Sequence, residues 1–170
     1  LIRRKPENMD VGRVENSWNG TINERMKGAA EMLLALSYVA PGMPLIYSGQ
    51  EYDLNHRLKF FEKDSIPKEK GNMWSLLEKL GKLKTSNPAM HGGKKAANYK
   101  KIATDNENVL IFTREKEGQS VTFVANFSSK EQAVNNAIKG EYVNYMINEK
   151  IAFIKKEISL RPWEYMILTR

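Results

Sequence analysis

The chain has 170 residues, of which 41% are hydrophobic and 28% charged, and it contains no cysteine. This composition is typical of a globular protein that can bury a core, and the lack of cysteine excludes disulfides and thiolate metal sites. No apolar run approaches the roughly 18 residues of a membrane-spanning helix, and the first ten residues lack the apolar region of a signal peptide. We therefore expect no membrane partner.

The net charge of +7 permits binding to nucleic acid. The lysines are nevertheless scattered, and the sequence shows no basic helix, no zinc-finger spacing and no aromatic RNA-binding pattern. A basic nucleic-acid module is therefore the last-ranked alternative, and we expect no nucleic-acid partner.

Histidines and carboxylates show no metal-binding pattern. His56 and His91 have no ligand companions at a zinc spacing, and Asp53, Asp64 and Asp105 do not form a calcium-loop spacing. We expect neither a metal nor a cofactor.

The first predicted element is a helix over residues 22–40. Its second half is apolar nearly all round, which is typical of a helix buried on more than one side. Pro41 and Gly42 end it. Apolar residues recur at spacings of three and four, namely Ile22, Met26, Ala29, Leu33, Leu36 and Ala40.

A short apolar run, residues 45–47, predicts a strand that is buried on both faces, as in a parallel sheet. A long polar and aromatic loop follows over residues 50–72. Asn72 is a candidate cap for a second helix. The apolar stripe of this helix comprises Met73, Leu76, Leu77, Leu80 and Leu83. The order helix, strand, helix is typical of an α/β protein.

The pattern changes after Gly93. Short segments rich in β-forming residues, at 107–115, 119–127, 156–160 and 162–169, predict an antiparallel sandwich or barrel. Residues 116–118, Lys-Glu-Gly, predict a hairpin turn. We place a domain boundary here, with one domain over residues 1–92 and another over 93–170.

Several segments together resemble a known family. These are PGMPLIYSGQE at 41–51, HRLKFFEKDSI at 56–66, LLEKLGKLKTSNPAM at 76–90, VTFVANFSS at 121–129 and LRPWEYMIL at 160–168. They are similar, in the same order, to the last barrel strand, the loop after it, the last barrel helix and two C-terminal strands of the α-amylase family, glycoside hydrolase family 13. The resemblance runs from about Glu15 to Arg170.

The resemblance implies an α+β fragment. Residues 1–92 would hold the last two helices and the last strand of a (β/α)8 barrel, with the loop after its seventh strand, and residues 93–170 would form an antiparallel Greek-key β-sandwich. A barrel closes only with all eight strands, so a partial barrel leaves an open strand edge and an apolar face. We expect a missing segment, or other copies in a homo-oligomer, to cover that face.

The resemblance also implies that this chain carries no catalytic residue. Retaining glycosidases use a carboxylate nucleophile and a carboxylic acid, and the family places both upstream of the segments present here. A third carboxylate belongs to a motif resembling NHDENSW. The chain keeps ENSW at 15–18, but Val14 stands at the aspartate position. An alternative register that uses Asp10 requires a four-residue insertion.

Six residues remain candidates for contact with a sugar, because barrel sites lie at the C-terminal ends of strands. They are Glu15, Asn16, Trp18, Tyr47, Gln50 and Glu51. Structural roles compete in three cases: Trp18 would pack, Tyr47 would lie in the barrel core, and Glu51 would pair with an arginine such as Arg57.

We therefore expect the C-terminal portion of an α-amylase-like glycoside hydrolase that acts on α-glucans such as starch. Its full-length parent would bind α-glucan or maltooligosaccharide, and this chain alone would be inactive. The alternative is a non-catalytic carbohydrate-binding or interaction module, for which Tyr99, Tyr142, Tyr145 and Trp163 are the candidate aromatic residues. A cytoplasmic and an exported bacterial location are both open.

Overall fold

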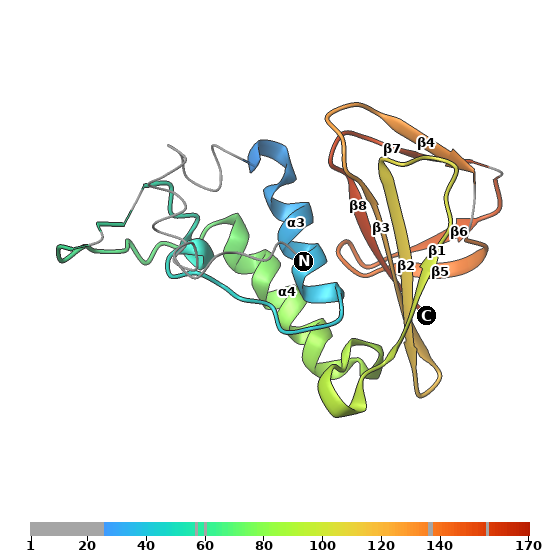
Figure 1. Ribbon diagram of the computed structural model, residues 1–170, viewed down its shortest axis with the longest axis horizontal. Coiled ribbons are helices and arrows are strands. Elements are labelled where there is room, and N and C mark those ends of the chain that lie inside the picture. The colour runs from blue at the N-terminus through green and yellow to red at the C-terminus, as the bar shows by residue number, and fades with distance from the viewer. Residues whose placement is uncertain (1–25, 57, 60, 136–137, 156) are drawn as a thin grey trace. The chain divides into compact units, whose positions relative to one another are not determined.

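The computed structural model describes residues 26–170 apart from 57, 60, 136, 137 and 156 (Figure 1). The chain divides into two compact units. One comprises Leu1–Ala30 and Leu45–Glu78, and the other comprises Glu31–Pro44 and Lys79–Arg170. No helix of the described part is long and apolar enough to cross a membrane.

Both predicted helices are present. A 3₁₀ turn, η2 (Lys27–Ala29), leads into α3 (Ala30–Val39), and α4 spans Asn72–Ser86. All five residues of the predicted α4 stripe are at most 9% exposed, as the helical spacing requires. In α3 the apolar side chains are buried nearly all round, because Met32, Ala35 and Val39 are fully enclosed.

The predicted strand at 45–47 is absent, and this expectation was wrong for the chain as it stands. Residues 43–47 have no regular secondary structure, and Leu45 is 80% exposed. A buried parallel strand needs a hydrogen-bonded neighbour on each side. The described part of the chain pairs no strand with this segment. Met43 and Leu45 are therefore largely exposed to water.

The C-terminal region is the predicted antiparallel sandwich (Figure 1). A six-stranded sheet runs in the order β1-β2-β3-β8-β5-β6, and β4 and β7 form a second sheet. The strands are β1 (Asn98–Ile102), β2 (Val109–Lys116), β3 (Gln119–Asn126), β4 (Gln132–Asn135), β5 (Gly140–Asn144), β6 (Glu149–Phe153), β7 (Glu157–Leu160) and β8 (Tyr165–Thr169). Every pairing is antiparallel.

The predicted hairpin joins β2 to β3. Its two turn residues, Glu117 and Gly118, have φ values of 53° and 75°. Positive φ at both central positions is the mark of a type I′ turn, whose twist suits a hairpin. The strands meet in register, with Lys116 opposite Gln119. The β2, β3, β7 and β8 predictions are thus confirmed, although β8 begins only at Tyr165 because Trp163 sits in a turn with φ 58°.

The centre of the six-stranded sheet is buried on both faces, which explains why seven of the eight β3 residues are enclosed. One face forms the sandwich core, in which Val124 and Leu168 pack with Ile158 and Leu160 from β7. The other face carries a row of aromatic rings. Neighbouring ring centres are 5.2–6.2 Å apart along Tyr99, Phe112, Phe123 and Tyr165.

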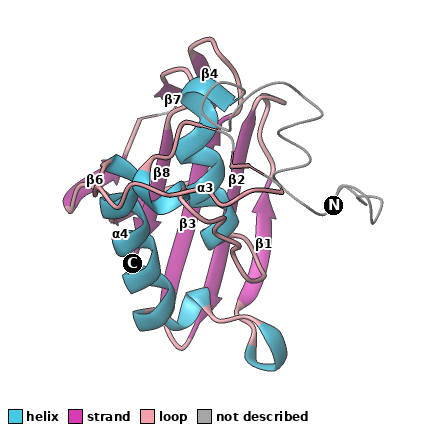
Figure 2. Cartoon of the chain, turned by 90° about the vertical axis from the view of Figure 1, so that its left-hand side faces the viewer, coloured by secondary structure: helices cyan, strands magenta, loops and turns pink. Residues whose placement is uncertain are grey.

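Helix α3 lies over this aromatic face (Figure 2). The fully buried Arg114 of β2 donates to the main-chain oxygens of Val39, Met90 and His91. Lys84 donates to the carbonyl of Tyr38 at 3.2 Å. Two cations therefore satisfy carbonyls that the end of a helix leaves without partners, where positive charge is favoured. Burial, and then repulsion from Arg114, lowers the pKa of Lys84.

Candidate functional site

A tight turn over residues 47–54 carries the three predicted sugar-contact residues that the structure describes. The amide of Gln50 donates to the carbonyl of Tyr47 at 3.0 Å, and the Gln50 side-chain oxygen accepts from the Tyr47 amide at 3.3 Å. The turn continues into a 3₁₀ segment, η3 (Gln50–Tyr52). These bonds bring Tyr47, Gln50 and Glu51 together, and all three are half-buried.

Gly49 allows this turn to form. Its φ of 92° lies in the region that favours glycine. A Cβ at this position would approach the Cδ2 atom of Leu54 to 2.6 Å. The amide of Leu54 also returns to the Gly49 carbonyl at 3.0 Å, which closes the loop. A larger residue at 49 would therefore have to displace the Leu54 side chain.

The Glu51 carboxylate has a local role. Its Oε2 atom accepts the Gly49 amide at 2.9 Å. The expected partner, Arg57, lies outside the described residues. The hydrogen bond to Gly49 fixes the orientation of the Glu51 carboxylate. Its other oxygen can still accept a hydrogen bond from a hydroxyl group.

Asp53 ties the turn to helix α4, a role that sequence reasoning assigned to Asn72. Both carboxylate oxygens of Asp53 accept from the Met73 amide at 3.3 Å. A carboxylate at the start of a helix satisfies an unpaired amide and favours the positive end of the helix dipole. Gly71 makes room for it, because a Cβ there would lie 1.9 Å from Asp53 Oδ2. A glycine just before a predicted helix was the one sequence signal for this contact.

An aromatic pair lies beside the cap and was also missed. The rings of Tyr52 and Trp74 stack with centres 5.5 Å apart and planes inclined by 29°. The Lys70 ammonium lies 4.4 Å from the centre of the Trp74 ring, a cation–π distance. Residues adjacent to the predicted Glu51 are thus fixed by aromatic packing.

The loop after the turn holds a third carboxylate in place. Asp64 accepts the amides of Lys59 and Ser65 at 2.9 and 2.8 Å, and its Oδ2 lies 3.5 Å from His56 Nε2. Those backbone hydrogen bonds, followed by the nearby His56, hold the pKa of Asp64 below its usual value. Among the described residues, no group of three or more histidines and carboxylates could hold a metal ion.

Half of the predicted site is outside the structure's description. Glu15, Asn16 and Trp18 precede residue 26, as do Val14 and Asp10. The described half brings Tyr47, Gln50 and Glu51 together in one turn. Its nearby carboxylates, however, are engaged with backbone amides: Glu51 with Gly49, Asp53 with Met73, and Asp64 with Lys59 and Ser65.

Residues 99–167 match the family model "Maltogenic Amylase, C-terminal domain". This match covers most of the sandwich, from β1 to the middle of β8. No curated protein matches the chain by sequence.

Solved amylase structures share the fold over most of the chain. A maltogenic α-amylase from Thermotoga neapolitana superposes with a TM-score of 0.70 and 21% identity, covering 85% of this chain and 36% of its own. An α-amylase from Lactobacillus plantarum superposes with a TM-score of 0.68 and 19% identity, covering 89% of this chain and 35% of its own. An Anoxybacillus α-amylase superposes with a TM-score of 0.65 and 19% identity, covering 96% of this chain and 36% of its own. The chain therefore spans about a third of the length of the proteins that it resembles.

Proposed function

We propose, from the premise that residues 99–167 are a C-terminal domain of the α-amylase family, that this chain is the C-terminal portion of a glycoside hydrolase acting on α-glucans. The observation that carries the proposal is the asymmetry of the structural matches. An Anoxybacillus α-amylase covers 96% of this chain, whereas the chain covers only 36% of that amylase. In this proposal the part of that amylase that the chain does not cover would include the catalytic barrel.

The proposed domain arrangement follows from the same observation. Residues 1–92 would complete the end of a barrel whose other strands come from the remainder of the parent, and residues 93–170 would form the sandwich. In that setting the 45–47 segment would find a strand on each side, and the turn that holds Tyr47, Gln50 and Glu51 would lie at its C-terminal end. Barrel enzymes build their active sites at that end of the strands.

The proposed ligand of the parent is a maltooligosaccharide. One solved structure that superposes with a TM-score of 0.60 is titled as a complex with maltotriose, and another with the same score as a complex with maltose. The half-buried Gln50 amide and Glu51 carboxylate offer the donors and acceptors that sugar hydroxyls require.

We further propose that the chain alone has no hydrolytic activity. Retaining hydrolysis needs two carboxyl groups about 5–5.5 Å apart on either side of the scissile bond. In the described loop and turn, Glu51, Asp53 and Asp64 are each bound to backbone amides instead. The purified chain, incubated with maltoheptaose and followed by chromatography of the products, is expected to release no shorter sugar.

Two controls make this test decisive. A full-length maltogenic amylase run in parallel establishes that the assay detects cleavage, and Glu51→Gln of this chain reports whether any trace activity arises from the turn. Turnover by the purified chain that Glu51→Gln abolishes would overturn the proposal of inactivity. It would leave the family assignment of residues 99–167 intact.

Self-association is the remaining part of the proposal. Met43 and Leu45 are 90% and 80% exposed, and an apolar segment of this kind favours cover by another polypeptide. In the absence of the rest of the parent, other copies of the chain would supply that cover as a homo-oligomer.

The aromatic residues of the sandwich do not favour the alternative of a binding module. Tyr142 is buried within the core, and the Tyr145 hydroxyl donates to the Lys79 carbonyl. Tyr99 is 48% exposed but leans on Phe112 with ring centres 5.2 Å apart. These contacts give three of the four candidate rings structural roles.

A further inference from the structure

The net positive charge of the chain is concentrated in one segment. Residues 79–104 contain seven lysines and no carboxylate. They account for the whole net charge of +7, because the remainder of the chain has equal numbers of basic and acidic residues. The segment begins within α4 and continues through η5 (Gly93–Lys95) into strand β1. A partner that recognises positive charge would therefore be attracted to this segment.

Four of these lysines lie in or just before strand β1, and all four are exposed. They are Lys94, Lys95, Lys100 and Lys101. None of the four forms an ion pair with another described residue. The only carboxylate among the β2 residues that pair with β1 is Glu115, and it lies opposite Asn98. The positive charge along β1 is therefore not compensated within the described chain.

Strand β1 also has an open edge. It is the outermost strand of the six-stranded sheet, beyond β2 (Figure 2), and it pairs with β2 alone among the described strands. Its first four residues are exposed, so side chains on both faces of the strand reach solvent. An edge strand presents amide and carbonyl groups that another extended chain can pair with. The surface thus offers main-chain hydrogen bonds as well as charge.

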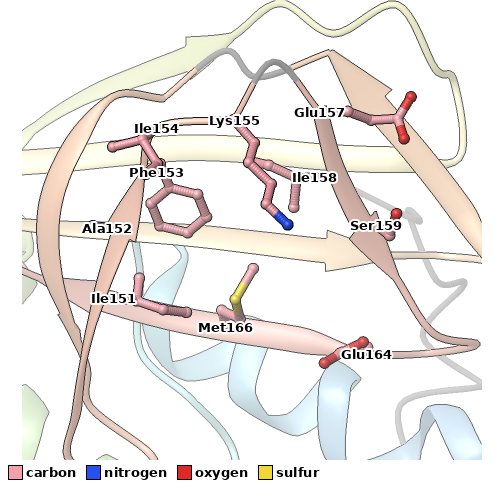
Figure 3. A pocket seen from close by; sticks show the side chains of 10 residues that line it. All are labelled: Ile151, Ala152, Phe153, Ile154, Lys155, Glu157, Ile158, Ser159, Glu164 and Met166. Atoms are coloured by element: carbon pink, nitrogen blue, oxygen red, sulfur yellow. The ribbon is translucent and has the colours of Figure 1, made fainter.

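The opposite edge of the same sheet is open but carries no net charge. Strand β6 pairs only with β5 among the described strands, and its two charged residues, Glu149 and Lys150, have opposite signs. Its Ile151 and Phe153 side chains turn into a pocket beside β7 (Figure 3). Strand β6 is therefore an internal control for any effect that an open edge has without net charge.

The lysines of β1 exclude a second copy of the chain as the partner. If two β1 strands paired antiparallel over their full length, Lys100 of each copy would lie opposite Lys100 of the other, because it is the middle residue of Asn98–Ile102. Like charges directly opposite one another destabilise a pair of strands, and lysines on edge strands oppose self-pairing. A partner at this edge must carry negative charge instead.

We propose that the edge of β1 binds an acidic segment of another protein, which adds to the sheet as a strand and places carboxylates opposite Lys100 and Lys101. Nucleic acid would use the lysines but leave the main-chain groups of the edge unpaired, so the open edge favours a polypeptide. Tyr99, which is 48% exposed, shares a face with Lys101 and offers a contact for an apolar side chain of the added strand. The proposal does not depend on the function proposed for the parent.

The test uses the full 170-residue chain and the pentapeptide Val-Glu-Glu-Val-Thr, blocked at both ends. Antiparallel pairing would set its glutamates opposite Lys101 and Lys100 and its second valine opposite Tyr99. Chemical shifts of the β1 amides measure binding, and Val-Gln-Gln-Val-Thr is the neutral comparison. The acidic peptide is expected to bind about five- to tenfold more tightly, because each exposed ion pair adds a modest stabilisation. High salt should reduce this difference.

Methylation of the peptide nitrogens tests whether the peptide binds as a strand. Only alternate amides of a strand face a given neighbour. One peptide methylated at its first, third and fifth nitrogens and another methylated at its second and fourth should therefore differ. One pattern should lower affinity at least about tenfold, and the other should leave it nearly unchanged.

Charge reversal locates the site. The double variant Lys100→Glu and Lys101→Glu should lose the preference for the acidic peptide and prefer Val-Lys-Lys-Val-Thr instead. Lys150→Glu, an exposed position on the other edge strand, is the matched control and should keep the preference of the unmodified chain. An unchanged circular dichroism spectrum checks the fold of each variant.

Five results would overturn the proposal. Two concern the unmodified chain with the plain peptides, namely equal affinity for the acidic and neutral peptides and no binding of the acidic peptide at millimolar concentration. Equal responses to the two methylation patterns would show that charge alone attracts the peptide. An equal effect of Lys150→Glu and of the double variant would remove the site from β1. Binding of a thymidine trinucleotide, which also carries two negative charges, as tightly as the acidic peptide would favour nucleic acid.

Discussion

At the scale of single residues, one buried polar side chain, Asn126, joins separate parts of the sandwich with its donors and its acceptor all in use. Asn126 is fully buried. Its Nδ2 donates to the carbonyls of Lys130, Leu160 and Arg161 at 2.8, 3.3 and 2.9 Å, while Oδ1 accepts the amide and the hydroxyl of Ser128. One amide thus joins the end of β3 to the connection between β7 and β8.

This geometry also bears on a sequence motif. Residues 126–128, Asn-Phe-Ser, fit the acceptor pattern for N-glycosylation, which requires a surface position. The Asn126 amide is enclosed and its donors are in use, so the folded chain excludes modification there.

Replacing Asn126 by aspartate should destabilise the sandwich. The introduced carboxylate would face three carbonyl oxygens without a proton to offer, and we expect a loss of about 3–5 kcal/mol in the free energy of unfolding. The midpoint temperature of thermal unfolding should fall by about 10 °C or more. Because burial raises the pKa of the new carboxyl in the folded state, the loss should grow as pH rises above about 4, the pKa in the unfolded chain, and shrink as pH falls back toward that value.

Asn148→Asp is the matched control for the same chemical change. Asn148 is exposed in the turn before β6 with φ 57°, a conformation that aspartate also tolerates. We expect its effect to lie within about 0.5 kcal/mol. Equal denaturation midpoints for the two variants would show that the Asn126 bonds add no net stability.

At the scale of elements, helix α4 begins where a distant carboxylate caps it. Asp53 precedes the Met73 amide by 20 residues along the chain and is held in place by the turn at 47–54. Two glycines belong to this region: Gly71 immediately precedes the helix, and Gly81 lies within it. Gly71 faces Asp53, whereas a Cβ at Gly81 would meet nothing within 4 Å.

Gly71→Ala and Gly81→Ala should therefore change stability in opposite directions. The first would push Asp53 away from the Met73 amide and cost about 1 kcal/mol, the usual value of a lost helix cap. The second would gain about 0.5–1 kcal/mol, because alanine restricts the unfolded chain and favours the helix. Urea denaturation followed by circular dichroism measures both.

A double-mutant cycle assigns the cost to the cap. In an Asp53→Ala background, Gly71→Ala should cost little, because the contact that it disturbs has already gone. An undiminished cost of Gly71→Ala in that background would place the effect in the backbone of Gly71 and contradict the capping role.

The same elements show what could be foreseen from the sequence. Helix α4 was predictable because its burial follows a single local period, and strands β2 and β3 were predictable because they are rich in β-forming residues. The Glu117-Gly118 turn between them was predictable from its residue types. Strands β1, β4, β5 and β6 were missed because they are short and largely exposed. The Asp53 cap joins positions 20 residues apart, which no local pattern encodes.

The burial of strand β3 differs from what its sequence pattern indicates. Its alternation of Val121, Phe123 and Ala125 with Thr122 and Val124 is typical of a strand with one buried face. In the structure nearly all of these positions are enclosed, because helix α3 covers one face and the second sheet covers the other. Arg114 belongs to the covered face and could not be recognised as buried from its residue type.

At the scale of the whole molecule, the failure of the 45–47 segment to form a strand is informative. The residues have the composition of a buried parallel strand, yet Leu45 and Ile46 are 80% and 41% exposed. Their conformation depends on neighbours that the described chain does not provide, consistent with a chain that spans about a third of the amylases it resembles. The apolar composition of residues 45–47 therefore indicates a strand that the described part of the chain does not form.

The last prediction tests the proposed self-association through this segment. In sedimentation velocity at micromolar concentrations we expect oligomers of the unmodified chain and a shift toward monomer for Leu45→Glu. Each buried leucine contributes roughly 1.5–3 kcal/mol, so the substitution should weaken association at least about tenfold. Ile147→Glu is the control, since Ile147 is 58% exposed in the turn between β5 and β6. A monomer at all concentrations would contradict self-association. If residues 43–46 form the contact, Leu45→Glu must weaken association more than Ile147→Glu does. An equal loss of association in both variants would place the contact on the sandwich instead.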